Sequence, residues 1–324
     1  MSKEIGGFIE LELTKGRHFH KHGVLLNSAR NALRYAIRAY DIKEIYVPYY
    51  TCPVVWQAIE DETCKIIPYE IDECFMPKDR INKRDFILYT NYFGICAKQI
   101  KTLSRIYHNL LVDNAMGFYS KHFGLASFYS PRKFFGVADG GILLCDKKLN
   151  EKFPKDTSYQ RFSHLIKRVD GGSNFAYEDF NKNDDSLINE PIKQMSNLTN
   201  KMLLNYDYKR AKAKRLKNFK YLATRLDTIN LLKDTLKYSD DRDNVPMYYP
   251  LLLKNGGGQK IYENLLANQI YCPKPWRGML DLIGDNKCKI ERNFYKNLIP
   301  LIIDQRYDKR DLDRIIFSIQ KFYK

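Results

Sequence analysis

Apolar and polar residues alternate in short blocks along residues 24–146, and these blocks predict strands and helices in turn. Runs rich in β-branched and aromatic residues predict strands, whereas apolar residues at helical spacing predict the helices between them. The expected strands span residues 44–48, 65–71, 85–90, 109–113 and 141–145, and the expected helices span residues 31–40, 53–59 and 98–107. Apolar strands that alternate with helices are typical of a mainly parallel sheet covered on both faces.

The remainder of the chain has a less regular pattern. Residues 165–190 are polar and contain Gly171 and Gly172, which predicts a surface loop. A long helix is expected from about residue 191 to 222, followed by a linker at 239–244. The C-terminal part is expected to contain a strand at 248–253, a glycine turn at 256–258, a helix at 261–268, an apolar run at 298–303 and a final helix at 309–323. We therefore expect a large α/β domain over residues 1–222 and a smaller α+β domain over residues 223–324.

Composition narrows the class of protein. The 324 residues are 44% hydrophobic, which is enough for a buried core, and no run approaches the roughly 18 apolar residues of a membrane span. The first residues show no apolar signal core. Seven scattered cysteines without a C-x-x-C pair predict free thiols in a reducing cytoplasm, and neither a disulfide framework nor a zinc site is expected. His18, His20 and His22 alternate, but no metal site is expected there either.

The net charge of +16 is compatible with nucleic acid, an anionic membrane surface or phosphorylated small molecules as partners. The lysines are spread over the whole chain, and the densest cluster is at residues 209–217. With its apolar neighbours this cluster predicts a solvated helix in preference to a nucleic-acid surface. We expect neither a nucleic-acid partner nor insertion into a membrane.

Two residues near strand ends suit one particular cofactor chemistry. Asp113 ends the apolar run that starts at Leu110, and Lys133 lies between a short apolar strand and the turn Asp139-Gly140-Gly141. A lysine amine can bond covalently to the aldehyde of pyridoxal 5'-phosphate (PLP), and a carboxylate can keep the pyridine nitrogen protonated. Taken alone, a lysine in a basic protein is usually solvated and an aspartate more often caps a helix, so the pair needs its wider context.

That context comes from the order and spacing of several segments. Besides the Lys133 segment they are Ile5–Glu12, Leu26–Leu33, Val47–Pro53, Asn91–Gly94, Val112–Ala115 and Ile303–Tyr307. Together they resemble, almost end to end, the DegT/StrS family of sugar aminotransferases. The resemblance implies a fold-type-I PLP enzyme, whose seven-stranded, mainly parallel sheet is sandwiched by helices and is followed by a small C-terminal domain.

The resemblance also implies roles for particular residues. Lys133 corresponds to the lysine that carries the cofactor, and Asp113 to the aspartate on the pyridine nitrogen. Ser127, with Ser130 as second choice, is expected to supply a hydroxyl to the phosphate. The phosphate is expected at a helix start, where backbone N–H groups and the helix dipole suit a dianion. The residues expected at that start are Ser28, Ala29, Arg30 and Asn31, of which Ser28 and Asn31 are also ordinary capping types.

The chain departs from the family pattern at several positions. Ala29 replaces the glycine of the phosphate turn, and Met116 stands where a glutamine usually approaches the cofactor. The aromatic residue that normally stacks on the ring falls near Cys52, so Tyr92 is a candidate for stacking, with Tyr50 and Phe93. A Gly-Tyr-Asn-Tyr-Arg motif, from which a neighbouring subunit supplies an asparagine, is missing, and Asn174 is a weak substitute.

The resemblance implies a PLP-dependent aminotransferase that moves an amino group from an amino acid, with glutamate as the donor, to a nucleotide-linked keto sugar. Such a reaction serves surface-polysaccharide or amino-sugar biosynthesis. Fold-type-I enzymes build their active site between two subunits, so a homodimer is expected. The alternative is a PLP-fold protein with other or lost catalytic activity that acts in binding or regulation.

Overall fold

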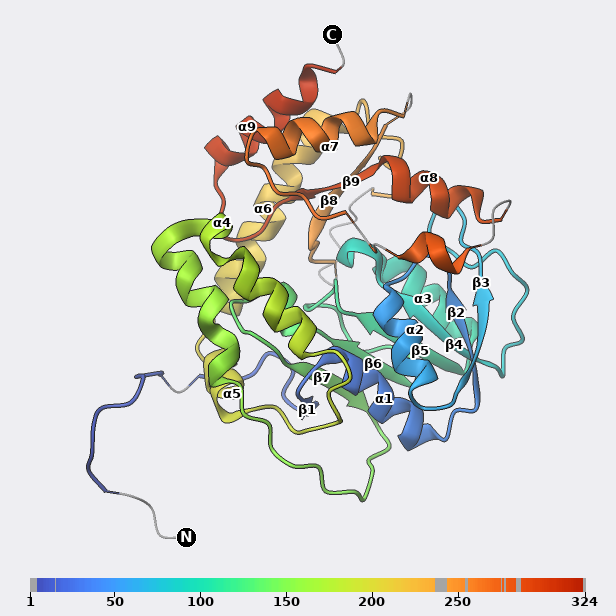
Figure 1. Cartoon of the computed structure of the whole chain (residues 1–324). Coiled ribbons are helices and arrows are strands. Elements are labelled where there is room, and N and C mark those ends of the chain that lie inside the picture. The colour runs from blue at the N-terminus through green and yellow to red at the C-terminus, as the bar shows by residue number, and fades with distance from the viewer. Residues whose placement is uncertain are drawn as a thin grey trace.

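A seven-stranded sheet forms the centre of the protein (Figure 1). The computed structural model describes residues 5–14, 16–236, 244–253, 256–274, 276, 278–283 and 287–322. The strands are β1 (Val24–Leu26), β2 (Glu44–Pro48), β3 (Lys65–Tyr69), β4 (Phe86–Thr90), β5 (Asn109–Asn114), β6 (Ala126–Tyr129) and β7 (Gly141–Cys145), in the order β1-β7-β6-β5-β4-β2-β3. Pairing is parallel from β6 to β3, whereas β7 joins β6 and β1 joins β7 antiparallel. The expected mainly parallel seven-stranded sheet is confirmed.

Helices cover both faces of this sheet. On one face, α1 (Ala29–Tyr40) and α2 (Pro53–Glu60) form a core with strand residues such as Leu111. On the other face, α3 (Ala97–Ile106) and C-terminal elements form a core that includes Val112. Leu111 and Val112 are neighbours in β5 and belong to different cores because side chains alternate along a strand. The described residues also contain four short 3-10 helices: η1 (Tyr92–Gly94), η2 (Pro131–Lys133), η3 (Tyr159–Phe162) and η4 (Met279–Leu282).

The loop expected at residues 165–190 is wrong, because most of this segment is helical. Helix α4 (Ser163–Ser186) consists of two helical segments joined at Gly172, whose φ of 79° and ψ of −173° are not helical. The second segment folds back beside the first (Figure 1), since Lys167 lies 2.6 Å from Asp179 and the rings of His164 and Phe180 are 5.8 Å apart. The buried residues of α4 are only His164, Ala176 and Asn183. Gly171-Gly172 and the polar run at residues 181–185 interrupt the helical pattern, and for this reason the sequence resembles a loop.

The single long helix expected at residues 191–222 is also wrong. Residues before 197 run alongside β1, where Gln194 forms a bridge with Leu26. Two helices follow, α5 (Asn197–Leu203) and α6 (Tyr208–Leu226). Each begins at a side-chain cap: Ser196 accepts a hydrogen bond from the Thr199 N–H, and Asp207 accepts one from the Arg210 N–H. Two separate caps explain why the helical pattern is interrupted.

The C-terminal part has its own two-stranded antiparallel sheet, β8 (Tyr248–Leu252) with β9 (Leu298–Ile302). Helices α7 (Gly258–Ala267), α8 (Lys289–Asn297) and α9 (Lys309–Gln320) surround it (Figure 1). Helix α6 continues to Leu226, past the expected boundary at residue 222, so the division into two domains stays a prediction. Most of the linker expected at 239–244 lies outside the described residues, and Asn244 at its end is buried.

The N-terminal residues 5–14 leave the body of the molecule as an extended arm (Figure 1). Ile5, Phe8 and Ile9 are 85–98% exposed in this arm. Within the described residues, none of the helices combines the length and the apolar composition needed to span a bilayer.

The close contact between β7 and the start of α1 leaves no room for a side chain at Gly141. A Cβ atom at this position would lie 2.1 Å from the Ser28 carbonyl oxygen and 2.6 Å from the Ala29 nitrogen. Both neighbours are backbone atoms that cannot rotate away, so we expect Gly141→Ala to lower the free energy of unfolding by about 1–3 kcal/mol. Gly136→Ala is the control, because its Cβ would meet only the end of the Tyr206 side chain at 3.3 Å. Urea unfolding followed by circular dichroism measures both, and equal losses would contradict this explanation.

Candidate active site

Asp113 lies at the carboxyl end of β5, in the middle of the sheet. It is paired in register with Thr90 of β4 and Phe128 of β6, and its side chain is buried. Because residues alternate along β5, Asp113 lies on the same face as Leu111, which is the face covered by α1 and α2. The hydroxyls of Thr90 and Thr51 lie 3.0 Å apart on this side and connect the strand end to the loop that leads into α2.

Helices α1 and α2 both begin at this edge of the sheet. Each follows a strand of the same direction, β1 and β2, so their N-termini lie at the carboxyl ends of the strands. Ser28 caps α1 by accepting a hydrogen bond from the Asn31 N–H at 3.1 Å, and Cys52 with Pro53 starts α2. Two positive helix ends therefore face the region of Asp113, which favours a bound anion.

Lys133 comes to the same place from the turn after β6. Burial raises the pKa of the Asp113 carboxyl, and the nearby charge of Lys133 acts in the opposite direction. Burial also raises the pKa of the Cys52 thiol, again against the charge of Lys133. These mutual effects show that Lys133, Asp113 and Cys52, which are far apart in sequence, lie within electrostatic reach of one another.

Two residues that the sequence did not single out hold the turn after Lys133. Gln305 donates a hydrogen bond to the carbonyl oxygen of Phe134 at 2.7 Å. The guanidinium of Arg215 lies 4.4 Å from the centre of the Phe134 ring and donates to Gln305 at 2.9 Å. Arg215 belongs to the basic cluster that was expected to be solvated, yet it is only 2% exposed. Gln305 lies in the segment Ile303–Tyr307, which was a motif of the resemblance but had no assigned role.

The Asp-Gly-Gly turn is structural. Asp139 is buried and accepts hydrogen bonds from Arg161 at 2.8 Å and from the Thr199 hydroxyl. Arg161 also contacts Asp156 at 2.6 Å, so a single guanidinium serves two buried carboxylates. Gly140 donates its N–H to the Asn27 carbonyl at 2.8 Å, which fixes the turn beside the start of α1.

Arg30, in the first turn of α1, has a donor that fits an anion. Its Nη1 donates to the Leu187 carbonyl, whereas its Nε is buried and has no hydrogen-bond partner among the described residues. Burial lowers the pKa of this guanidinium. A buried donor without a partner costs free energy, and a phosphate oxygen could satisfy it.

Four of the expected cofactor-binding side chains have other contacts. The Ser127 hydroxyl lies 3.0 Å from His122 Nδ1 and 3.1 Å from the Phe123 carbonyl, and Ser127 lies in β6 beside Val112 on the opposite face to Asp113. Asn31 donates to the carbonyls of Glu190 and Pro191.

The other two lie in the hydrophobic core. Tyr92 is fully buried, with Phe75 stacked on it at 5.0 Å, and Met116 is also buried. Tyr50, another candidate for stacking, also lies in this core, where Trp276 packs edge-on against it at 4.5 Å.

The hollow of about 320 Å³ beside Ser120 belongs to a different region. It is lined by Phe19, His20, Tyr119, Ser120, Lys121, His122 and Lys212. Ser120 accepts a hydrogen bond from Asn91, which also donates to Asn114 at the end of β5. Asn114 points to the opposite face from Asp113. The candidate site therefore lies on the other face of the sheet, where Asp113, Lys133 and the N-termini of α1 and α2 come together.

Solved structures share this fold. A chain from Streptococcus pneumoniae assigned as a sugar aminotransferase, in its PLP form, aligns with a TM-score of 0.65 at 16% identity over 92% of this chain and 86% of that chain. Helicobacter pylori PseC, an aminotransferase involved in pseudoaminic acid biosynthesis, aligns with 0.63 at 17% over 93% and 86%. A DegT/DnrJ/EryC1/StrS aminotransferase from Brucella abortus aligns with 0.59 at 13% over 93% and 86%.

No protein-family model matches this chain, and no curated protein sequence matches it either. The similar solved structures confirm the resemblance to DegT/StrS aminotransferases at the level of the fold.

The buried Asp113 carboxylate leads to a prediction about the cofactor-free protein. Because its folded pKa is raised, ionisation opposes folding once the pH exceeds the unfolded value of about 3.9. Asp113→Asn keeps an acceptor for the Ala115 N–H, which bonds Asp113 at 2.8 Å, and removes the charge. We expect a higher thermal midpoint than wild type at pH 7, with the difference disappearing below about pH 4.

Exposed Asp146→Asn is the control, with an expected change within about 0.5 kcal/mol. Scanning calorimetry from pH 4 to pH 7 makes the comparison. A variant that is less stable than wild type at pH 7 would show that the Asp113 charge stabilises the cofactor-free fold.

Proposed function

We propose that the chain is a PLP-dependent aminotransferase. The observation that carries this proposal is the meeting of Lys133 and the buried Asp113 at the edge where α1 and α2 begin. A primary amine, a buried carboxylate and a helix start for an anion are the groups that PLP requires from a protein. The fold shared with solved aminotransferases supports the same conclusion.

The residues present fit the cofactor. Asp113 would accept a hydrogen bond from the protonated pyridine nitrogen, and the pyridinium would compensate its buried charge. The first turn of α1, with the unpartnered Arg30 Nε, would hold the phosphate. Cys52 would lie against the ring: burial raises the pKa of its thiol, and a neutral thiol packs on an aromatic surface as a small apolar group.

When bound, PLP supplies an electron sink for a carbanion next to the transferred nitrogen. Lys133 would first hold the cofactor and then move a proton to and from the substrate carbon as general base and acid. Gln305 and Arg215 position the turn of Lys133 through Phe134, so the amine is presented from a fixed backbone.

We further propose glutamate as amino donor and a nucleotide-linked keto sugar as acceptor, in surface-polysaccharide or amino-sugar biosynthesis. Support comes from the sugar aminotransferase among the similar folds and from the net charge of +16, which suits an anionic nucleotide carrier. The seven cysteines, all free in the structure, are consistent with a cytoplasmic enzyme.

We propose that two copies form the functional unit. The two segments of helix α4 expose five large apolar side chains: Ile166, Val169, Phe175, Tyr177 and Phe180. Several large exposed apolar side chains on one element favour an interaction surface. Asn174 lies exposed on the same helix, and the apolar N-terminal arm offers a second contact.

The cofactor role of Lys133 can be tested by absorption and mass spectrometry. Wild type with added PLP should show a visible band that borohydride abolishes, leaving the cofactor attached to the peptide that contains Lys133. Lys133→Ala should form no covalent adduct and lose amino transfer by a factor of roughly 10³, because proton transfer by a positioned group contributes about 10²–10⁴. Exposed Lys148→Ala is the control and should behave as wild type. Wild type without any band would favour a non-catalytic binding protein.

The dimer can be tested by light scattering. Wild type should have twice the 38.3 kDa chain mass, and Val169→Asp should yield monomers because a charge would be buried in the interface. Leu266→Asp on α7 is the control at an apolar position that is 48% exposed, and it should leave the mass unchanged. A monomeric wild type would rule out the proposed assembly.

A further inference from the structure

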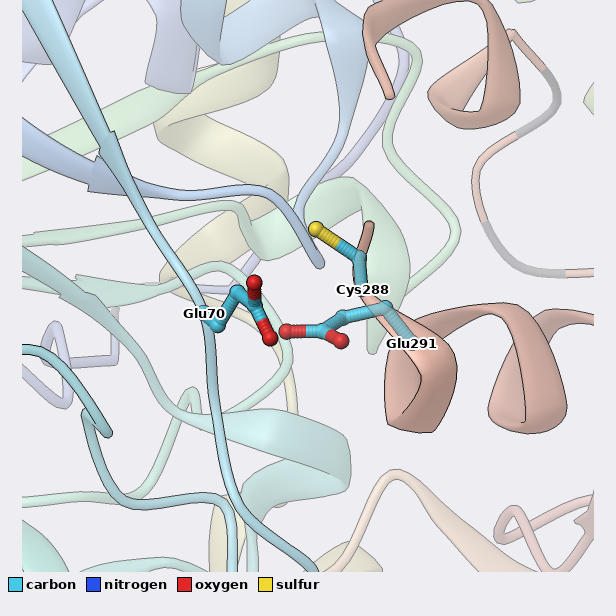
Figure 2. A group of neighbouring side chains, drawn as sticks. All are labelled: Glu70, Cys288 and Glu291. Atoms are coloured by element: carbon cyan, nitrogen blue, oxygen red, sulfur yellow. The ribbon is translucent and has the colours of Figure 1, made fainter. Parts of the chain in front are cut away.

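Three side chains with metal-binding atoms meet between the large sheet and the C-terminal part. Glu70 directly follows β3, while Cys288 and Glu291 lie at the start of α8 (Figure 2). One ligand atom of each residue lies within 4.8 Å of the other two. The segments are more than 200 residues apart in sequence, so the cluster joins two distant parts of the fold.

The burial and hydrogen bonding of Glu291 are a second, independent observation at this cluster. The residue has no exposed surface, and its Oε1 accepts a hydrogen bond from the Ile71 N–H at 2.7 Å. Its Oε2 is also buried but has no hydrogen-bond partner among the described residues. Figure 2 shows that the carboxylates of Glu291 and Glu70 point toward each other. A buried carboxylate oxygen without a donor is costly, and another carboxylate only raises that cost.

The charges of the cluster favour a cation. Lys78 lies 3.2 Å from Glu70 and contributes one positive charge. Lys287 and Arg292 lie near Cys288, and the Asp79 carboxylate accepts a hydrogen bond from the Glu70 N–H at 2.7 Å. Two carboxylates and one thiolate carry three negative charges, and a dication between them would offset most of their mutual repulsion.

We propose that Glu70, Cys288 and Glu291 bind a divalent cation, with Zn²⁺ as the ion that best fits one sulfur and two oxygen ligands. Zinc accepts cysteine sulfur at about 2.3 Å and carboxylate oxygen at about 2.0–2.2 Å, usually with four ligands in a tetrahedron. Those bond lengths place neighbouring ligand atoms about 3.3–3.8 Å apart. The three side chains therefore need to close by about 1 Å, and water completes the fourth position.

The site is structural and independent of the proposed transferase reaction. It would attach the start of α8 to the end of β3, next to the buried hydrogen bond from Ile71 to Glu291. Glu70 is 29% exposed on its side chain, which provides a path for the ion. An ion that binds only the folded chain also stabilises it by mass action.

Metal binding can be measured on the full-length protein after treatment with a chelator. Titration with Zn²⁺, read by elemental analysis, should give one ion per chain and a higher thermal midpoint. Titration with Co²⁺ should produce the near-ultraviolet charge-transfer band of a thiolate–cobalt bond, which identifies a cysteine ligand directly. Neither readout depends on transferase activity.

Two variants test the ligands, and for each the control is the same substitution at an exposed residue of the same type. Glu291→Gln retains an acceptor for the Ile71 N–H and can donate to Glu70, so it should fold but bind Zn²⁺ about 100-fold more weakly or worse. Cys288→Ser should lose the cobalt band. Exposed Cys74→Ser and Glu73→Gln should bind as wild type.

The proposal is overturned if wild type takes up no stoichiometric zinc, because the two carboxyl groups then share a proton instead. It is equally overturned if the cobalt band survives Cys288→Ser, or if Glu291→Gln binds zinc as tightly as wild type.

Discussion

A carboxylate buried on a central strand needs positive charge around it, and this requirement governs the arrangement of the candidate site. Asp113 lies at the end of β5, where its pKa is raised by burial. Ionisation is favoured by the Lys133 ammonium and by the positive ends of α1 and α2, which lie at the same edge because both helices follow strands of one direction. The topology therefore supplies the electrostatic environment, and the proposed pyridinium would complete it.

The groups that hold this environment in place lie outside it. Arg161 pairs with both Asp139 and Asp156, and Lys193 adds a second cation 3.5 Å from Asp156. These pairs keep the Asp-Gly-Gly turn beside the start of α1. Arg215 and Gln305 fix the backbone after Lys133. Removing one partner from such a buried charged network leaves the others uncompensated, and this typically costs about 3–5 kcal/mol. The position of the Lys133 amine therefore depends on Arg161 and Arg215, which take no part in the proposed chemistry.

The sequence predicted the parts of the fold that have strong periodicity. The five strands given ranges between residues 44 and 145 were located to within about two residues, because buried strands are apolar runs with clear turns between them. Strand β6 was expected only as a short apolar strand before Lys133, and β1 had no predicted range. Helix α4 was missed because Gly172 divides it into two short segments and a polar run follows at residues 181–185, so the helical pattern is interrupted twice. In the candidate site, Asp113 and Lys133 were predicted from the order of motifs, and the structure brings them together, while their cofactor roles stay predictions. Ser127 was a weaker choice because its hydroxyl has local partners in His122 and Phe123, and a sequence does not show on which face of β6 it lies. Arg215 could not be distinguished from the solvated cations around it, since its partner Gln305 is 90 residues away.

The contacts of the C-terminal part indicate that it is coupled to the large sheet at two separate places. On one side, Arg215 and Gln305 connect α6 and the chain after β9 to the turn of Lys133. On the other side, Glu291 of α8 is hydrogen-bonded to the chain after β3. Two buried polar attachments resist both a hinge and a twist between the parts, because any displacement would leave charged or polar groups without partners. A cation held by Glu70, Cys288 and Glu291 would strengthen the second attachment, and the fixed geometry at Lys133 would then depend on both.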